Sequence, residues 1–287
     1  MLSDHYRSGR RGLSFELFPP KTASGEEAMY ATVVELATFK PDYITCTYGA
    51  GGSTRDKTLE IVTQVKQRFG LPVASHLTCV GSTVEQLRGY LQEAGDRGVD
   101  YIVALRGDPP KGETSFTPVV GGLRYANELV ALIRRDFPRF GIAVAGYPEV
   151  HQEATSAAAD LESLARKVKA GGDIVITQLF YDNTDYFRFV EHCRALGVTA
   201  PIIPGILPVT NLAQIQRITA LCKARLPASF VNELSERDDP QWQYEVGVAF
   251  ATRQVQELLD GGAPGVHFYV LNKATATAAV LRGVNWR

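Results

Sequence analysis

Short apolar runs alternate with longer amphipathic runs along almost the whole sequence. The short runs are nearly continuous in Val, Ile, Ala, Phe and Tyr, which is typical of parallel strands buried on both faces. They occur at residues 13–17, 42–47, 72–77, 100–105, 142–146, 173–178, 201–206 and 265–270. Eight strands with intervening helices have one economical arrangement, so we predict the α/β class and a single-domain (β/α)8 TIM barrel over residues 13–287.

The runs between the predicted strands have the period of helices. Ile61, Val65 and Phe69 recur at helical spacing, and capping-box patterns predict where several helices begin. The capping pairs are Ser24 with Glu27, Ser82 with Glu85 and, in a weaker form, Asn211 with Gln214. A doubly wound sheet, the rival architecture, usually has a glycine fingerprint after its first strand, but residues 18–20 are Phe-Pro-Pro. We interpret residues 225–244 as an extra loop or short helix before the last helix.

Charge and cysteine usage exclude several function classes. The 287 residues include 30 basic and 31 acidic side chains, a net charge of −1, without a basic stripe, which argues against a nucleic-acid partner. The four cysteines lack CxxC or metal-ligand spacing, so we expect free thiols and no metal site. Residues 1–12 lack the apolar core of a signal peptide, and we interpret them as a flexible solvated arm. No run is long enough to span a membrane, so we expect a cytoplasmic protein.

Polar and aromatic residues follow nearly every predicted strand. This pattern favours an enzyme, because the catalytic groups of this fold come from the carboxyl ends of its strands. Glu16 lies near the end of the first apolar strand, where a carboxylate is either salt-bridged or functional. If its surroundings are apolar, the pKa of Glu16 should rise, which would suit a general acid.

Other polar candidates each have a structural alternative. The glycine loop at residues 49–52 nearly matches a dinucleotide-binding fingerprint, but a tight turn that caps a helix explains it equally well. The Arg-Gly-Asp segment at 106–108 could bind a polar cofactor edge or form a structural ion pair. We interpret His76 and His151 as satisfied polar contacts rather than metal ligands.

Together these motifs resemble the methylenetetrahydrofolate reductase family, in its bacterial form with a catalytic domain only. The segment Ser-Phe-Glu-Leu-Phe-Pro-Pro at 14–20 is similar to the family's opening signature, and further matching segments follow in the family's order. They are residues 47–50, 76–79, 104–108, 147–151, 176–178, 203–208 and 267–272. The resemblance runs from Ser14 to about Lys273, and the ordered set is specific although each motif alone is weak.

The resemblance implies a barrel that holds FAD non-covalently and works by a ping-pong reaction. NADH or NADPH would pass a hydride to the flavin, and 5,10-methylenetetrahydrofolate would then take it and become 5-methyltetrahydrofolate, feeding methionine synthesis. The redox chemistry belongs to the flavin, and the protein supplies position and electrostatics. Bacterial relatives are commonly homo-oligomers, and the regulatory extension of longer eukaryotic relatives is not expected. The sequence does not decide between NADH and NADPH.

Site residues follow from the resemblance one position at a time. Glu16 matches the family's general acid, which would deliver a proton to N10 of the folate, and Asp108 matches a carboxylate that could stabilise the cationic iminium. Positions that match contacts of the flavin or the nicotinamide are Thr47, Tyr48, Ala50, His76, Arg106, Gly107, Asp108, Ala126, Tyr147, His151, Asp160, Ser163, Arg166 and Lys167. Positions that match contacts of the folate are Gln178, Gln214 and Lys273.

Four positions depart from the family's pattern. Ser163 stands where relatives often have asparagine, and Lys273 stands where arginine is common. Lysine keeps the positive charge but lacks the forked guanidinium group that binds a carboxylate through two hydrogen bonds. Leu179 and Ile218 stand where relatives can have phenylalanine. Two other functions remain as alternatives: another FAD-dependent barrel oxidoreductase of the proline-dehydrogenase type, and a flavin- or folate-binding protein without turnover.

Overall fold

The computed structural model describes residues 1–7, 9–48, 55–109 and 116–286. Its strands begin and end within about one residue of the predicted runs. They are β1 (Gly12–Leu17), β2 (Tyr43–Cys46), β3 (Val73–Thr78), β4 (Tyr101–Leu105), β5 (Gly141–Gly146), β6 (Ile174–Thr177), β7 (Ile202–Ile203), β8 (Gly205–Ile206) and β9 (Gly265–Tyr269). The run predicted at 201–206 differs from the others, because Pro204 divides it into β7 and β8.

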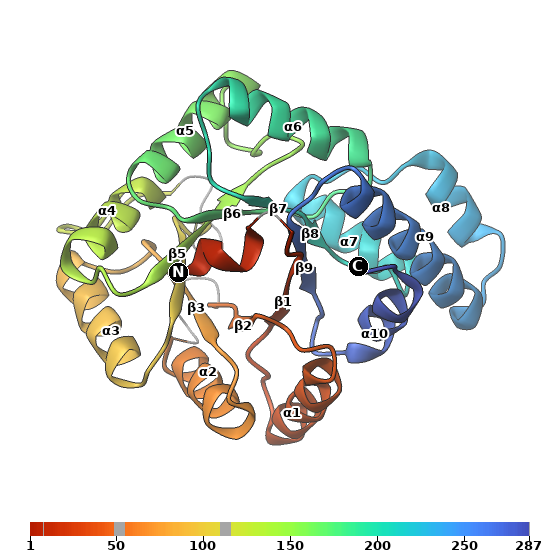
Figure 1. The fold of residues 1–287 in the computed structure, drawn as a ribbon, viewed down its shortest axis with the longest axis horizontal. Coiled ribbons are helices and arrows are strands. Elements are labelled where there is room, and N and C mark those ends of the chain that lie inside the picture. Colours follow the sequence, from red (N-terminus) through yellow and green to blue (C-terminus); the bar gives the residue numbers. More distant parts are fainter. Residues whose placement is uncertain (8, 49–54, 110–115, 287) are drawn as a thin grey trace.

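The described strands form one parallel sheet that curls into a nearly closed barrel (Figure 1). Their order is β7-β6-β5-β4-β3-β2-β1-β9-β8. β7 pairs with β6 whereas β8 pairs with β9, so the two halves of the divided strand join opposite edges of the sheet. Proline has no N–H to donate, but the Pro204 carbonyl accepts from the His267 N–H at 3.0 Å. The predicted (β/α)8 TIM barrel is therefore confirmed.

Helices cover the outside of the barrel (Figure 1). Those described are α1 (Ala23–Ala37), α2 (Arg55–Phe69), α3 (Val84–Asp96), α4 (Ala126–Asp136), α5 (Ala157–Lys169), α6 (Asn183–Ala195), α7 (Leu212–Cys222), α8 (Ala228–Ser235), α9 (Pro240–Asp260) and α10 (Ala274–Gly283). Asn211 caps α7 as predicted, accepting from Gln214 N at 2.8 Å. The other two predicted caps are displaced, since Thr22 caps α1 and Thr83 caps α3. Helix α8 and the start of α9 occupy the segment expected to be a loop or short helix.

Three aspartates tie neighbouring strands together at the amino-terminal ends of the barrel. Asp42, Asp100 and Asp173 stand directly before β2, β4 and β6. Each carboxylate accepts a hydrogen bond from a backbone N–H near the start of the preceding odd-numbered strand, and each also pairs with a basic side chain. The N–H donors are Leu13 at 2.9 Å, Val73 at 2.9 Å and Ile142 at 2.7 Å. The basic partners are Arg10, Lys66 and Arg134.

The two faces of the barrel wall bury separate apolar clusters, because side chains alternate along a strand. Phe15 and Phe268 belong to the large cluster beneath the helices, with ring centroids 6.2 Å apart. Tyr43 and Val103 belong to a smaller cluster inside the barrel. A third cluster joins residues of α7, α8 and α9 at the carboxyl end of the strands. The interior face is the one that also carries Glu16.

The first residues of the chain correct the expectation of a flexible solvated arm. Residues Leu2–Tyr6 form a 3-10 helix, η1, drawn in red at the centre of the barrel in Figure 1. Leu2 is fully buried and Tyr6 is 5% exposed, and both pack against the interior cluster. A Cβ on Gly141, the first residue of β5, would lie 2.7 Å from Leu2 Cβ. The prediction was wrong because it rested on the polar and basic composition of the segment, whereas its two large side chains, Leu2 and Tyr6, fill the amino-terminal opening of the barrel.

Candidate active site

Glu16 lies at the carboxyl end of β1 inside the mouth of the barrel, between two histidines. His76 Nε2, on β3, is 3.1 Å from Glu16 Oε2, and His267 Nε2, on β9, is 3.3 Å from the same oxygen. The three residues are 7%, 8% and 0% exposed in the order Glu16, His76 and His267. The carboxylate therefore contacts two imidazoles and is not isolated among apolar side chains.

This arrangement corrects the expected direction of the Glu16 pKa. Burial raises the pKa of the carboxyl, but the charge of His76 and the hydrogen bond from His267 outweigh burial and lower the pKa to about 2. The expectation of a raised pKa assumed apolar surroundings, and the two imidazoles make the surroundings polar. In the free protein Glu16 is thus a carboxylate at neutral pH. To act as a general acid it must first receive a proton from a neighbour.

Three of the buried polar atoms that lack a hydrogen-bond partner among the described residues lie on β2 and β3. They are Thr45 Oγ1, Thr78 Oγ1 and His76 Nε2. The distance from His76 Nε2 to Glu16 suits an ion pair, but its direction does not suit a hydrogen bond. Unpaired buried polar atoms cost free energy, so this cluster fits the polar edge of a bound ligand.

The Arg-Gly-Asp segment follows β4 at the same end of the barrel. Arg106 forms a bidentate pair with Glu153, with Nη1 to Oε2 at 2.8 Å and Nη2 to Oε1 at 2.6 Å. Gly107 has φ +91°, and a Cβ there would lie 2.8 Å from Val80, so the position requires glycine. Asp108 is exposed. The ion pair of this segment therefore forms with Glu153 and leaves the Asp108 carboxylate facing solvent.

A second polar group lies between the end of β5 and helix α5. Lys167 Nζ donates to Ala145 O at 2.5 Å and lies 5.8 Å from the centre of the Tyr147 ring. Burial lowers the pKa of Lys167 to about 8, although the Asp160 carboxylate acts in the opposite direction. Asp160 Oδ2 accepts from the His151 N–H at 3.0 Å. Burial and a nearby guanidinium lower the pKa of His151 as well.

The other predicted cofactor positions lie around these two groups. Ser163 Oγ donates to Ala159 O and accepts from Arg166 Nη2, both at 2.8 Å, so the serine holds the exposed arginine on α5. Thr47 and Tyr48 follow β2, and Ala126 is the first residue of α4. Ala50 and the loop at 49–52 lie outside the described residues.

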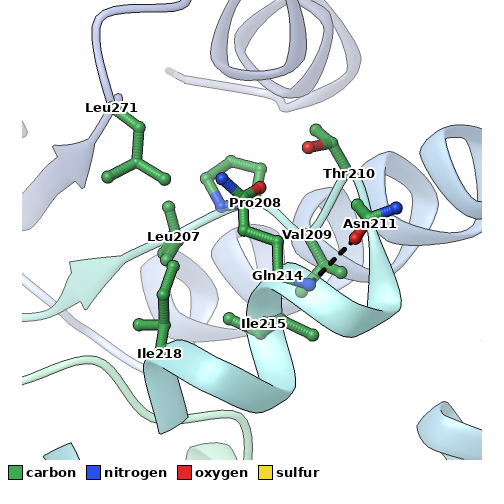
Figure 2. Close-up of a pocket in the computed structure, with 9 residues that line it drawn as sticks. All are labelled: Leu207, Pro208, Val209, Thr210, Asn211, Gln214, Ile215, Ile218 and Leu271. Carbon is green, nitrogen blue, oxygen red and sulfur yellow. Dashed lines mark hydrogen bonds between the residues drawn. The ribbon is translucent and has the colours of Figure 1, made fainter. Parts of the chain in front are cut away.

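The predicted folate positions are distributed over the same end of the barrel. Gln214 lines a small, open pocket together with Leu207, Ile218 and Leu271 (Figure 2). Gln178 follows β6 and its Oε1 accepts from Leu179 N at 2.9 Å. Lys273 is exposed at the start of α10. Gln214 and Ile218 thus share one pocket, while Gln178 and Lys273 lie outside its lining.

The predicted residues therefore form separate groups and not one continuous cluster. The described contacts join Glu16 to His76 in one group. In a second group they join His151 to Asp160 and Tyr147, and Tyr147 to Lys167. Ser163 contacts Arg166 on α5. Between Glu16 and Asp108 the described part of the chain has no direct contact.

Three polar residues of the site had no role predicted from the sequence. His267 contacts Glu16, Glu153 holds Arg106, and Asn272 makes two bonds to the Phe18 backbone, to N at 2.9 Å and to O at 2.7 Å. For His267 a signal was present, because a polar residue inside an apolar strand has to find a partner. Glu153 and Asn272 lie in loops, where nothing in the sequence indicates the partner.

The described residues contain no group of three or more His, Cys, Asp or Glu side chains arranged to hold a metal ion. Across residues 1–7, 9–48, 55–109 and 116–286, no helix is both long enough and apolar enough to cross a membrane.

Comparisons with known proteins point to one family. The profile of the family described as methylenetetrahydrofolate reductase matches residues 1–285. The chain is 40% identical over 275 residues to 5,10-methylenetetrahydrofolate reductase of Pectobacterium carotovorum, covering 95% of this chain and 89% of that protein. The Escherichia coli protein of the same name is 40% identical over 273 residues, covering 95% and 90%. Methylenetetrahydrofolate reductase (NADH) 1 of Arabidopsis thaliana is 37% identical, but the match spans only 48% of its length.

A solved structure supports the fold independently. An uncharacterized protein from Clostridium thermocellum that binds two copies of 5-methyl-5,6,7,8-tetrahydrofolic acid aligns over 99% of this chain and 98% of its own. The TM-score is 0.62 and the sequence identity is 13%. At this identity the likeness concerns the fold alone.

Proposed function

Because the chain belongs to the methylenetetrahydrofolate reductase family, we propose that it reduces 5,10-methylenetetrahydrofolate to 5-methyltetrahydrofolate with NAD(P)H through bound FAD. The two half-reactions alternate at one site in ping-pong order, and the product feeds methionine synthesis. Relatives whose names specify NADH favour NADH as the donor. The protein acts as a homo-oligomer, as is common among bacterial relatives.

One observation carries the proposal: a buried carboxylate at the mouth of the barrel, in contact with two imidazoles. Opening the five-membered ring of the folate requires a proton at N10, which breaks the bond from N10 to the methylene carbon and leaves a cationic iminium at N5. Glu16 delivers that proton, and the hydride then reduces the iminium. The exposed carboxylate of Asp108 stabilises the cation electrostatically.

The polar groups of this end of the barrel fit a non-covalent dinucleotide. When bound, the flavin supplies hydride transfer between the nicotinamide and the folate. Lys167 is a partly buried cation that forms no ion pair among the described residues, and together with Arg166 it suits the cofactor's phosphates or ribose. The unpaired atoms of Thr45, Thr78 and His76 suit a polar ring edge. The other proposed contacts of FAD or the nicotinamide are Thr47, Tyr48, Ala50, Arg106, Gly107, Asp108, Ala126, Tyr147, His151, Asp160 and Ser163.

The folate would lie across the pocket of Figure 2, because Gln214 offers an amide beside apolar side chains there. Gln178 supplies a second amide for the pterin edge. Lys273, which is exposed, supplies the cation for the glutamate tail.

The deciding experiment follows the flavin absorbance of the purified protein without oxygen. NADH should bleach the visible band, and methylenetetrahydrofolate should then restore it. Bleaching without recovery would discard the folate and favour another flavin barrel oxidoreductase, for which proline is the first substrate to try. A bound flavin that NADH does not bleach would indicate a binding protein without turnover, and no flavin band after FAD is supplied would overturn the proposal.

The variant Glu16→Gln separates the half-reactions. We expect it to bind FAD and to be reduced by NADH at the normal rate, because hydride transfer to the flavin needs no acid. Reoxidation by the folate should slow by about 10²- to 10⁴-fold, the usual contribution of a general acid. Stopped-flow absorbance measures both steps. Glu27→Gln, an exposed carboxylate on α1, is the matched control, and a normal folate step in Glu16→Gln would remove Glu16 from the mechanism.

A further inference from the structure

A line of buried polar side chains continues from Glu16 down the interior of the barrel to its amino-terminal end. His267 Nδ1 lies 2.8 Å from Ser14 Oγ, which lies 3.5 Å from the Tyr6 hydroxyl. The Tyr6 hydroxyl lies 2.9 Å from that of Tyr43. We call His267, Ser14, Tyr6 and Tyr43 the interior chain. No member is more than 5% exposed, and only His267 contacts Glu16.

We propose that the interior chain supplies the proton that Glu16 delivers: His267 stores it, and Ser14 and Tyr6 stabilise the charged imidazole. This inference rests on the proposed function, since it concerns the acid of the folate half-reaction. His267, Ser14 and Tyr6 are then positioning residues, because they act on the substrate only through Glu16.

The order of donors and acceptors follows from the carboxylate. An ionised Glu16 only accepts, so His267 Nε2 must carry a hydrogen. If the ring is neutral, Nδ1 is an acceptor and Ser14 donates to it. If the ring is charged, Nδ1 donates to Ser14, and the Ser14 hydrogen has to turn to another acceptor, which the Tyr6 oxygen provides. The interior chain can therefore provide a hydrogen-bond partner for Nδ1 in both charge states of His267, because the donor and acceptor roles of its hydroxyl groups reverse.

The proton transfer balances without another reactant. In the resting state Glu16 is ionised and His267 is charged. The N–H bond at His267 Nε2 breaks as an O–H bond forms at Glu16 Oε2, and the same carboxyl then gives a proton to N10 of the folate. Afterwards His267 is neutral, and one proton from solvent restores the cluster. The low pKa of Glu16 is consistent with this resting state, because burial would otherwise raise it.

The other titratable groups near Glu16 and His267 are less suited to store the proton that Glu16 delivers. Burial raises the pKa of Cys46 and of Tyr269 well above their ordinary values, so both keep their protons. Burial also raises the pKa of Tyr43 to about 12 and that of Tyr6 well above its ordinary value, so both phenols serve as hydroxyls and not as charges.

His76 approaches the same carboxylate oxygen but differs from His267 in its surroundings. Its Nε2 is not directed along a hydrogen bond to Glu16, and no described side chain extends from it into the barrel. It lies beside Glu16 without neighbouring hydroxyl groups that could reverse their hydrogen bonds when the ring changes its charge. We therefore assign the storage of the proton to His267.

The test uses Tyr6→Phe and Ser14→Ala, which remove one hydroxyl each and leave the Glu16–His267 contact in place. Without an acceptor for the Ser14 hydrogen, or without Ser14 itself, the charged ring loses a hydrogen bond. The rate of folate-dependent flavin reoxidation should then fall off at a pH lower by about half to one unit than in the unchanged protein. Flavin reduction by NADH should stay within about twofold. Tyr101→Phe, which removes the hydroxyl that contacts His5 outside the interior chain, should leave both steps unchanged.

A second measurement keeps the inference testable if a variant folds poorly. In the FAD-bound protein with ¹⁵N-labelled histidine, the nitrogen shifts of His267 should report a charged ring whose titration moves to lower pH in Tyr6→Phe. An unchanged His267 titration together with an unchanged pH profile would overturn the proposal. If the unchanged protein never passes a hydride to the folate, the proposed function fails instead, while the nitrogen shifts still decide whether the interior chain controls His267.

Discussion

At the scale of single residues, the charge of Lys167 depends on pH in the range where enzymes are assayed. Burial against β5 lowers the pKa of this amine to about 8. Below pH 8 the free protein presents a cation, and above pH 8 it presents a neutral amine. An anionic phosphate binds the cation, so we expect FAD affinity to fall as the pH rises through about 8 and to change little between about 6 and 7.

The variant Lys167→Met should remove that pH dependence and weaken FAD binding about 10-fold or more at pH 7, the loss expected for one charge-assisted hydrogen bond. Titration of the apoprotein with FAD, followed by flavin fluorescence, measures both effects. Lys169→Met, an exposed lysine on the same helix, should bind FAD with the pH dependence unaltered. An identical pH profile in Lys167→Met would show that another group controls the affinity.

Single residues also mark the limit of sequence-based prediction of the site. Glu16 was predicted because a carboxylate in an apolar strand needs a partner or a function, and the structure brings it to His76 and His267. The direction of its pKa could not be predicted, because the partners come from strands 60 and more than 200 residues away along the chain. The pairing of Arg106 with Glu153 likewise depends on two loops that meet only in the folded barrel.

At the scale of elements, the strand starts are fixed by the aspartates that precede β2, β4 and β6. Asp173 accepts from Ile142 N at 2.7 Å and pairs with Arg134 at 3.0 Å, so it joins β5, β6 and α4. The variant Asp173→Ala leaves a backbone N–H without its acceptor. We expect the free energy of unfolding to fall by about 2–3 kcal/mol, measured by urea denaturation. Asp260→Ala, an exposed carboxylate at the end of α9, should change it by less than about 0.5 kcal/mol, and equal effects would contradict the assignment.

The positions of the elements were largely predictable, because a buried parallel strand and an amphipathic helix leave different periods in the sequence. Helix caps were predicted less accurately. Ser82 and Thr83 are both acceptable caps, and only the local backbone selects Thr83 for α3. The division of the strand at Pro204 was not predicted, because the residues on both sides of Pro204 form one continuous apolar run in the sequence.

At the scale of the whole molecule, the barrel is closed at its amino-terminal end by η1. Leu2 is fully buried there, against Gly141 at the start of β5. We expect Leu2→Ala to lower the free energy of unfolding by about 2–4 kcal/mol, the usual cost of a cavity in a core. Val34→Ala, at a residue on α1 that is 58% exposed, is the matched control and should have little effect. Thermal and urea unfolding of both variants test this. If Leu2→Ala left the free energy of unfolding unchanged, residues 1–12 would be better described as a flexible solvated arm.

The barrel as a whole was predictable from its alternating runs, whereas η1 was not. A segment of a few residues has too little apolar content to identify a core position from composition. Its place becomes apparent only when the glycines that begin β1 and β5 are seen to leave room for Tyr6 and Leu2.

Pro204 separates β7 and β8, which have the fewest paired residues of the described strands. On either side of it two residues pair with a neighbouring strand, at Ile202–Ile203 and Gly205–Ile206, whereas β3 and β4 pair from Ala74 to Thr78. Side-chain hydrogen bonds connect the strands at this point. Thr177 Oγ1 accepts from Gly205 N at 2.9 Å, and the Tyr269 hydroxyl donates to Thr177 O at 2.7 Å. We therefore expect this part of the barrel wall to open before the more extensively paired strands do, and a ligand that contacts β6 and β9 to stabilise it.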